Sequence, residues 1–207
     1  YWQLVLPALA ERYRVVAVDP PGFGKSDKPR ARYELPWLVD WIVAFMDARG
    51  IDRATIMGGS LGGHLAMMLA IEHPERVDRL VLMDSCGAWP EPGILAVIGL
   101  ATIWQDPFVI DHLRRNWPKI YGDIVSSDTE ASRRLLRYQM AVMADLKAYY
   151  PAGRAASRAL RSIFYHSCRS RMNEIRQPVL LIWGEDDKIH LHSEATYLRE
   201  NLPDARL

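Results

Sequence analysis

Four short apolar runs along the chain predict buried β-strands. They are Arg14–Val18, Ala54–Met57, Leu80–Met83 and Val179–Trp183. Each is rich in branched or large apolar side chains, and near-continuous runs of this kind are typical of strands that are covered on both faces of a sheet. Three of the runs lead directly into turns rich in Gly, Pro or Asp, where a strand of a parallel sheet would end.

Apolar residues between these strands recur at helical spacing. Within Tyr33–Gly50 they fall on one helical face, and Gly50 is a suitable C-terminal cap. The apolar residues of that face are Trp37, Leu38, Trp41, Ile42, Phe45 and Met46. A second helix is expected over Leu61–His73, ended by Pro74. The alternation of strands and helices predicts an α/β fold, with a mostly parallel sheet and helices on both of its faces.

Residues 88–176 interrupt this alternation. The segment contains helical patterns such as Glu130–Tyr149, no convincing strand and several prolines. We therefore expect a core formed by residues 1–87 and 177–207, and a helical cap inserted over residues 88–176. The cap carries many apolar residues, which either face a substrate pocket or pack the cap onto the core. They include Trp89, Ile94, Leu95, Ile98, Leu100, Ile103, Trp104, Phe108 and Trp117.

Composition excludes several classes of protein. The formal net charge of +1 over 207 residues lacks the basic excess of a nucleic-acid-binding protein. Cys86 and Cys168 form neither a disulfide framework nor a metal-ligand cluster, and they fit a reduced, cytoplasmic compartment. The longest apolar stretch, Gly93–Trp104, is too short to span a bilayer. The expected partner is a small-molecule substrate, and no pattern bears on oligomeric state.

The segment Gly58-Gly59-Ser60-Leu61-Gly62 matches the pattern G-x-S-x-G. A nucleophile on a sharp strand-to-helix turn stands clear of the sheet, but its backbone is strained and its neighbours are crowded. Glycines on either side are expected to relieve that crowding. The following helix directs its first amides at a developing oxyanion, so the Leu61 amide is a candidate donor. The alternative is a glycine-rich turn in a non-catalytic α/β domain.

Together with this pattern, three further segments occur in the order found in one family. They are Asp19–Ser26, the stretch His73–Val77 followed by Leu80–Leu82, and Pro178–Asp187. The chain resembles the α/β-hydrolase family, of the type with a serine nucleophile and a helical cap. The resemblance covers nearly all of the chain outside residues 88–176, and the predicted cap falls where many members carry theirs.

The resemblance implies a catalytic triad of serine, acid and histidine. Ser60 takes the position of the nucleophile and Asp187 that of the acid. Asp84, at the end of the preceding strand, is the alternative acid. The family's histidine follows a last strand, of which Ala205–Leu207 resembles the beginning, so the catalytic histidine is expected not to be present in this chain. The second oxyanion donor is expected before the helix predicted over residues 2–12.

The chain contains six histidines that are candidates for the missing base. His64 is expected to pack inside the helix after Ser60, and His73 and His112 are expected at the surface or in the cap. His166 could line a pocket. His190 and His192 follow Asp187 so closely in sequence that neither is expected to reach back to Ser60.

The resemblance implies a serine hydrolase that acts through an acyl-enzyme, without a metal or an organic cofactor. Its substrate would be an ester, or a related acyl or carbon–carbon bond, of a small apolar molecule. Without a histidine base, the 207 residues would be nearly inactive. The alternatives are a non-catalytic ligand-binding module of the same fold, and an acyltransferase or perhydrolase.

Overall fold

The computed structural model describes residues 2–88, 115–116, 118–119, 129–144, 146–187 and 189–207. The apolar cap residues named above, from Trp89 to Trp117, lie outside this part of the chain, as does His112.

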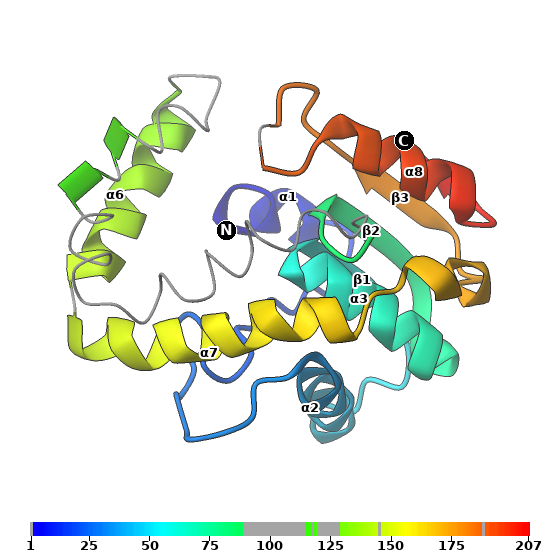
Figure 1. Ribbon diagram of the computed structural model, residues 1–207, viewed down its shortest axis with the longest axis horizontal. Coiled ribbons are helices and arrows are strands. Elements are labelled where there is room, and N and C mark those ends of the chain that lie inside the picture. Colours follow the sequence, from blue (N-terminus) through cyan, green and yellow to red (C-terminus); the bar gives the residue numbers. More distant parts are fainter. Residues whose placement is uncertain (1, 89–114, 117, 120–128, 145, 188) are drawn as a thin grey trace.

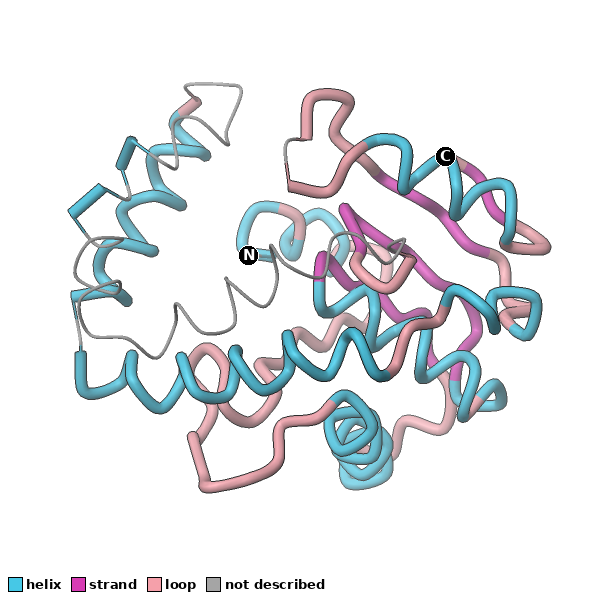
Figure 2. The backbone as a smooth tube through the Cα atoms, in the orientation of Figure 1, coloured by secondary structure: helices cyan, strands magenta, loops and turns pink. Residues whose placement is uncertain are grey.

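A parallel sheet of four strands forms the centre of the described structure (Figure 2). The strands are β1 (Ala54–Ser60), β2 (Val77–Ser85), β3 (Val179–Ile182) and β4 (Ala205–Arg206), paired in the order β1-β2-β3-β4. Every pair is parallel. The predicted α/β class and three of the four predicted strands are confirmed, and β4 forms where the sequence suggested that a further strand begins.

The prediction of a strand at Arg14–Val18 was wrong. Residues 14–18 form no strand, and the side chains of Val16 and Val18 are 41% and 40% exposed. Strand propensity favours an extended backbone, but a strand also needs a neighbour that accepts and donates its ladder of hydrogen bonds. Among the described residues the sheet consists of β1 to β4, and residues 14–18 pair with none of these strands.

Helices pack on one face of the sheet. α2 (Leu35–Ala48), α3 (Leu61–Glu72) and α8 (His192–Asn201) share one core with the buried strand residues Leu80, Leu82, Val179 and Leu181, whereas Leu180 and Ile182, which face the other way on β3, are 45% and 44% exposed. The middle of α3 is buried on all sides, from Gly63 to Ala70, because this helix lies between the strands and α2. Both helices predicted in this region are confirmed, and Gly50 follows α2 with a positive φ of 60°.

The described elements between β2 and β3 are helical. They are α6 (Glu130–Ala144), α7 (Leu146–Tyr165) and the 3-10 helix η4 (Arg169–Glu174). α7 packs on the core through buried Ala155, Ala159 and Ile163, whereas α6 lies at its far end, away from the sheet (Figure 1). The division into a core and a cap over residues 88–176 stays a prediction. Shorter elements complete the fold: η1 (Trp2–Leu4), α1 (Leu6–Ala10) and η2 (Pro74–Arg76).

The sheet topology brings one set of chain segments together. Because β1, β2 and β3 are parallel neighbours, their carboxyl ends lie at one edge of the sheet. Ser60 ends β1, Ser85 ends β2, and the turn after Ile182 follows β3. This is the edge at which α/β folds place their ligand sites.

Candidate active site

Ser60 occupies a strained turn between β1 and α3. Its backbone has φ 50° and ψ −119°, in the left-handed half of conformational space that residues other than glycine rarely adopt. Gly58 makes the turn possible, because a Cβ atom there would lie 2.3 Å from the carbonyl carbon and oxygen of Gly62. Strain of this kind is typical of functional positions, and it is the backbone that the G-x-S-x-G pattern predicts.

The need for glycine after Ser60 falls at a different residue than expected. A Cβ atom on Gly62 would meet no atom within 4 Å, so the expectation that this glycine relieves crowding by its missing side chain was wrong. A Cβ atom on Gly63 would lie 1.7 Å from Ser85 Oγ and 2.8 Å from Ser85 Cβ. The close approach is therefore between the first turn of α3 and the end of β2, which the sequence pattern does not reveal.

Two side chains contact the Ser60 hydroxyl. His190 Nε2 lies 3.1 Å from Ser60 Oγ, and Cys86 Sγ lies 3.5 Å from it. Cys86 is held beside Ser60 by its backbone N–H, which donates to the Ser60 carbonyl over 3.1 Å. The same thiol lies 4.0 Å from His190 Nε2, so the half-buried Ser60 and the buried Cys86 and His190 form one polar cluster.

The expectation that His190 could not reach Ser60 was therefore wrong. Asp187 folds the chain back after β3, because its Oδ1 accepts hydrogen bonds from the Ile189 and His190 amides at 2.7 and 2.9 Å. Trp183 Nε1 donates to the His190 carbonyl over 2.8 Å and holds the far side of the same turn. The sequence feature that indicates this contact is the position of His190 in the turn after β3, the strand beside β2. Its short distance from Asp187 along the chain is not informative.

Glu194 faces the other nitrogen of the His190 ring. Its Oε2 lies 3.8 Å from His190 Nδ1, and the two side chains are only 13% and 7% exposed. Burial alone would lower the pKa of His190, but the neighbouring Cys86 thiol and the Glu194 carboxylate raise this pKa to about 10. Sequence reasoning missed Glu194, whose place in the first turn of α8 becomes informative only once His190 is seen in the site.

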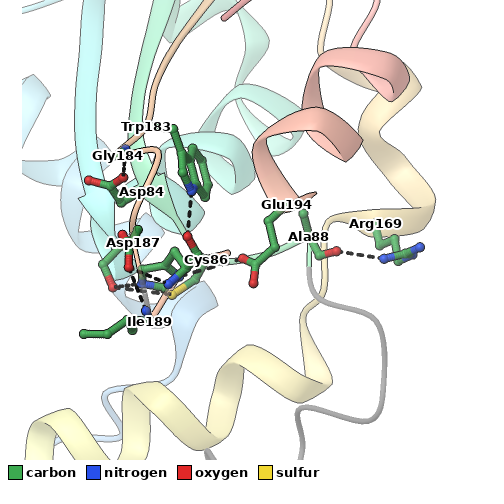
Figure 3. Close-up of polar contacts among 11 residues, drawn as sticks. Asp84, Cys86, Ala88, Arg169, Trp183, Gly184, Asp187, Ile189 and Glu194 are labelled. Atoms are coloured by element: carbon green, nitrogen blue, oxygen red, sulfur yellow. Dashed lines mark hydrogen bonds and ion pairs between the residues drawn. The ribbon is translucent and has the colours of Figure 1, made fainter. Parts of the chain in front are cut away.

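The two candidate acids lie on neighbouring strands or just beyond them: Asp84 is near the end of β2, and Asp187 is in the turn after β3 (Figure 3). Asp84 has a positive φ of 42°, and its Oδ1 accepts the Gly184 amide over 3.0 Å. Burial raises the pKa of Asp84, and the nearby Asp187 carboxylate raises it further. The hydrogen bonds of Asp187 described above go to backbone amides, so this carboxylate fixes the turn that carries His190.

The other predicted site residues lie as follows. Leu61 is the first residue of α3, directly after Ser60, so its amide belongs to the unbonded N-terminal turn of the helix. His64 is fully buried and bonds to the His166 carbonyl, away from Ser60. His73 contacts Glu75 at 3.7 Å, and His192 is exposed at the start of α8. Within the described residues, no cluster of three or more potential ligands could hold a metal ion.

The site is thus a serine at a strained strand-to-helix turn, with an imidazole in hydrogen-bonding range. Comparison with known proteins agrees with this class: the profile of the alpha/beta hydrolase fold family matches residues 1–207, and the chain belongs to that family. None of the helices in the described part of the chain is long and apolar enough to cross a membrane.

Its relatives are named hydrolases. The 2-hydroxymuconate semialdehyde hydrolase of Pseudomonas sp. strain CF600 is 34% identical over 189 residues, which cover 91% of this chain and 65% of that protein. A 2-hydroxy-6-oxononadienedioate/2-hydroxy-6-oxononatrienedioate hydrolase of Paraburkholderia phymatum is 32% identical over 186 residues, covering 85% and 61%. The chain therefore spans less than two thirds of the length of either protein.

Solved structures of hydrolases also resemble this chain. A mutant of the meta-cleavage product hydrolase CumD of Pseudomonas fluorescens IP01, complexed with acetates, superposes with a TM-score of 0.75 and 28% identity. The match covers 100% of this chain and 74% of that one.

Proposed function

We propose that this protein is a serine hydrolase that cleaves a carbon–carbon bond next to a carbonyl group in a small, conjugated acid. The observation that carries the proposal is the strained Ser60, whose hydroxyl lies 3.1 Å from an imidazole nitrogen. The substrate class is supported by the relatives, whose names describe hydrolases of 2-hydroxymuconate semialdehyde and of related 2-hydroxy-6-oxo acids.

The proposed reaction begins when Ser60 Oγ attacks the carbonyl carbon and passes its proton to a histidine. The Leu61 amide, at the N-terminus of α3, stabilises the oxyanion that forms. Collapse of this intermediate breaks the carbon–carbon bond, and the electron pair leaves on a carbon conjugated with the acid. That carbon takes up a proton, and water then releases the acyl group from Ser60. In this proposal Asp187, the acid expected from the sequence, acts by fixing the turn after β3 through the Ile189 and His190 amides.

The same chemistry would cleave an ester or a lactone, in which the leaving atom is oxygen. One solved relative, 26% identical with a TM-score of 0.75, is described as an enzyme that degrades N-acyl homoserine lactones. Ester hydrolysis and acyl transfer to an alcohol therefore stand as the second proposal. A ligand-binding module without catalysis is disfavoured, because such a protein gains nothing from a strained serine beside a buried histidine.

The test has two stages. First, a fluorophosphonate probe should label the chain at Ser60, with and without added imidazole as a free base. Ser60→Ala should abolish the labelling, and the matched control Ser193→Ala, an exposed position on α8, should not. Absence of labelling under both conditions would overturn the proposed function.

Second, 2-hydroxymuconate semialdehyde and a p-nitrophenyl ester should be compared as substrates. Loss of the conjugated chromophore with the first, dependent on Ser60, supports carbon–carbon cleavage. Turnover of the ester alone would favour the second proposal, and formation of a new ester in the presence of added alcohol would identify acyl transfer.

A further inference from the structure

We propose that His190 takes up the proton of Ser60 in this protein, with Glu194 as the residue that positions its ring. The inference rests on the proposed role of Ser60 as a nucleophile and adds the identity of its base. It assigns a catalytic role to a histidine outside the position that the family resemblance implies.

The contact geometry meets the requirements for a general base. A base must lie within about 2.6–3.2 Å of the atom that it deprotonates, and His190 Nε2 lies 3.1 Å from Ser60 Oγ. The base must in turn be oriented by a third group, and Glu194 Oε2 lies 3.8 Å from the opposite ring nitrogen. Among the described histidines, His190 is the one whose ring nitrogen is bonded to the Ser60 hydroxyl.

The surroundings fix the ring of His190 in place. Asp187 accepts the amides of Ile189 and His190, and Trp183 donates to the His190 carbonyl. The Trp183 ring packs edge-on against the imidazole, with ring centroids 6.4 Å apart and planes at 87°. His190 is only 5% exposed, so its ring is held against Ser60 from several sides. Asp187 thus acts on the backbone of His190 while Glu194 faces its ring.

As Ser60 Oγ bonds to the carbonyl carbon, its O–H bond breaks, the electron pair stays on oxygen and the proton moves to Nε2 of neutral His190. The resulting imidazolium is stabilised by the Glu194 carboxylate. It then gives the same proton to the leaving carbon or oxygen, which restores neutral His190 for the attack of water on the acyl-enzyme.

The charged and titratable groups around His190 give this reaction a distinctive pH dependence. Cys86 at the end of β2 and Glu194 on α8 raise the pKa of His190. Asp84, near the end of β2, and Asp187, after β3, add negative charge nearby. At neutral pH the ring is therefore mostly an imidazolium that donates to Ser60 Oγ. The reactive neutral ring accumulates as the pH rises, so acylation of Ser60 should accelerate into the alkaline range.

The test measures the rate at which a fluorophosphonate labels Ser60 of the 207-residue chain over a range of pH. His190→Gln should slow labelling by about 100-fold or more, the usual contribution of a general base. The matched control is His192→Gln, because His192 lies two residues further along and is exposed. This control should label at the wild-type rate. Equal rates for wild type and His190→Gln would overturn the proposal and place the base outside these residues.

Two further measurements separate catalysis from folding. Circular dichroism melts establish that each variant is folded. In His190→Ala, added imidazole should restore labelling by at least 10-fold by entering the space of the lost ring, which a purely structural defect would not allow. Glu194→Gln should shift the inflection of the labelling rate to a lower pH. The proposal would also be overturned if imidazole failed to restore labelling of a folded His190→Ala protein and Glu194→Gln left the pH profile unchanged. Failure of the proposed function differs from these outcomes, because Ser60 would then resist labelling in every variant, with or without imidazole.

Discussion

Ser60 Oγ and His190 Nε2 lie 3.1 Å apart although 130 residues separate them in sequence. The sheet makes this contact, because the parallel strands β1, β2 and β3 deliver their carboxyl ends to one edge. Cys86, directly after β2, contacts the side chains of both Ser60 and His190. The site is therefore assembled from strand ends, and the chemistry of each residue depends on its neighbours across the sheet.

Substitution of Asp187 should slow the labelling of Ser60 more than substitution of Asp84. Asp187→Ala removes the acceptor of two backbone amides and releases the turn that carries His190, so Ser60 labelling should fall by roughly 10- to 100-fold. Asp84→Ala removes the acceptor of the Gly184 amide and a side-chain contact with Asp187 but leaves the two amide bonds of Asp187 in place, so it should cost less than about 10-fold. The measurement is the labelling rate of the two purified variants at one pH.

Asp187→Asn serves as the matched control. The amide oxygen of this variant can still accept the two backbone hydrogen bonds, but its negative charge is lost. A labelling rate close to wild type would show that Asp187 acts through the backbone. A loss as large as that of Asp187→Ala would instead show that its charge stabilises the imidazolium directly.

The sequence predicted those parts of the fold that depend on local pattern. The periodicity of Leu61–His73 and the apolar run Val179–Trp183 predicted α3 and β3 to within one residue, and the run Ala54–Met57 predicted β1 up to its last three residues. Residues 14–18 were wrongly predicted because strand propensity says nothing about whether a partner strand lies alongside. The turn at Ser60 was predictable because strain at a nucleophile requires a recognisable local pattern.

The contacts of the site could not be predicted in the same way. His190 reaches Ser60 through the turn set by Asp187, and Gly63 is required by the approach of Ser85. Both are relations between segments far apart in sequence, which periodicity does not encode.

The pH profile of Ser60 labelling should respond to the groups that raise the pKa of His190. In the wild type this pKa is raised to about 10, so labelling should still be rising in the alkaline range. Glu194→Gln removes the carboxylate and Cys86→Ala removes the thiol, and each should shift the inflection toward the ordinary value of about 6.5. At neutral pH, both variants should therefore contain more of the neutral ring. The measurement is the labelling rate of each variant against pH.

Arg199→Gln is a suitable control, since it changes an exposed charge further along α8 without contacting the site. Its profile should match that of the wild type. A profile that is the same in Glu194→Gln, Cys86→Ala and Arg199→Gln would show that another group governs the titration.

The glycines around Ser60 should differ in their tolerance of a side chain. Gly58→Ala and Gly63→Ala each force a Cβ atom into occupied space, at the backbone of Gly62 and at Ser85 respectively. Such overpacking costs about 1–3 kcal/mol in the free energy of unfolding and should also slow Ser60 labelling. Gly62→Ala meets open space within α3 and should be neutral or stabilise the fold by up to about 1 kcal/mol. Urea unfolding and probe labelling of the three variants measure both effects. Equal destabilisation by all three substitutions would contradict the predicted difference between Gly62 and the other two glycines.

His64 should make the protein sensitive to mild acid. Its Nε2–H donates to the His166 carbonyl over 2.7 Å, and burial lowers the pKa of the ring to about 4. In the unfolded chain the same ring has a pKa of about 6.5. Between these two values the unfolded state binds a proton that the folded state refuses, so stability falls as the pH falls through this window. The shift from 6.5 to about 4 corresponds to a loss of about 3 kcal/mol.

The effect is isolated by comparing variants across this window. His190 does not interfere, because its raised pKa stabilises the fold fully below about 6.5, and that contribution is lost only as the pH rises toward about 10. The free energy of unfolding in urea should be measured at about pH 7 and about pH 5 for the wild type, His64→Gln and the control His73→Gln, at the other end of α3. The wild type and His73→Gln should lose stability in parallel on acidification, and His64→Gln should lose less because it has no ring to protonate. The same acid-induced loss in all three proteins would mean that the buried ring of His64 does not govern this transition.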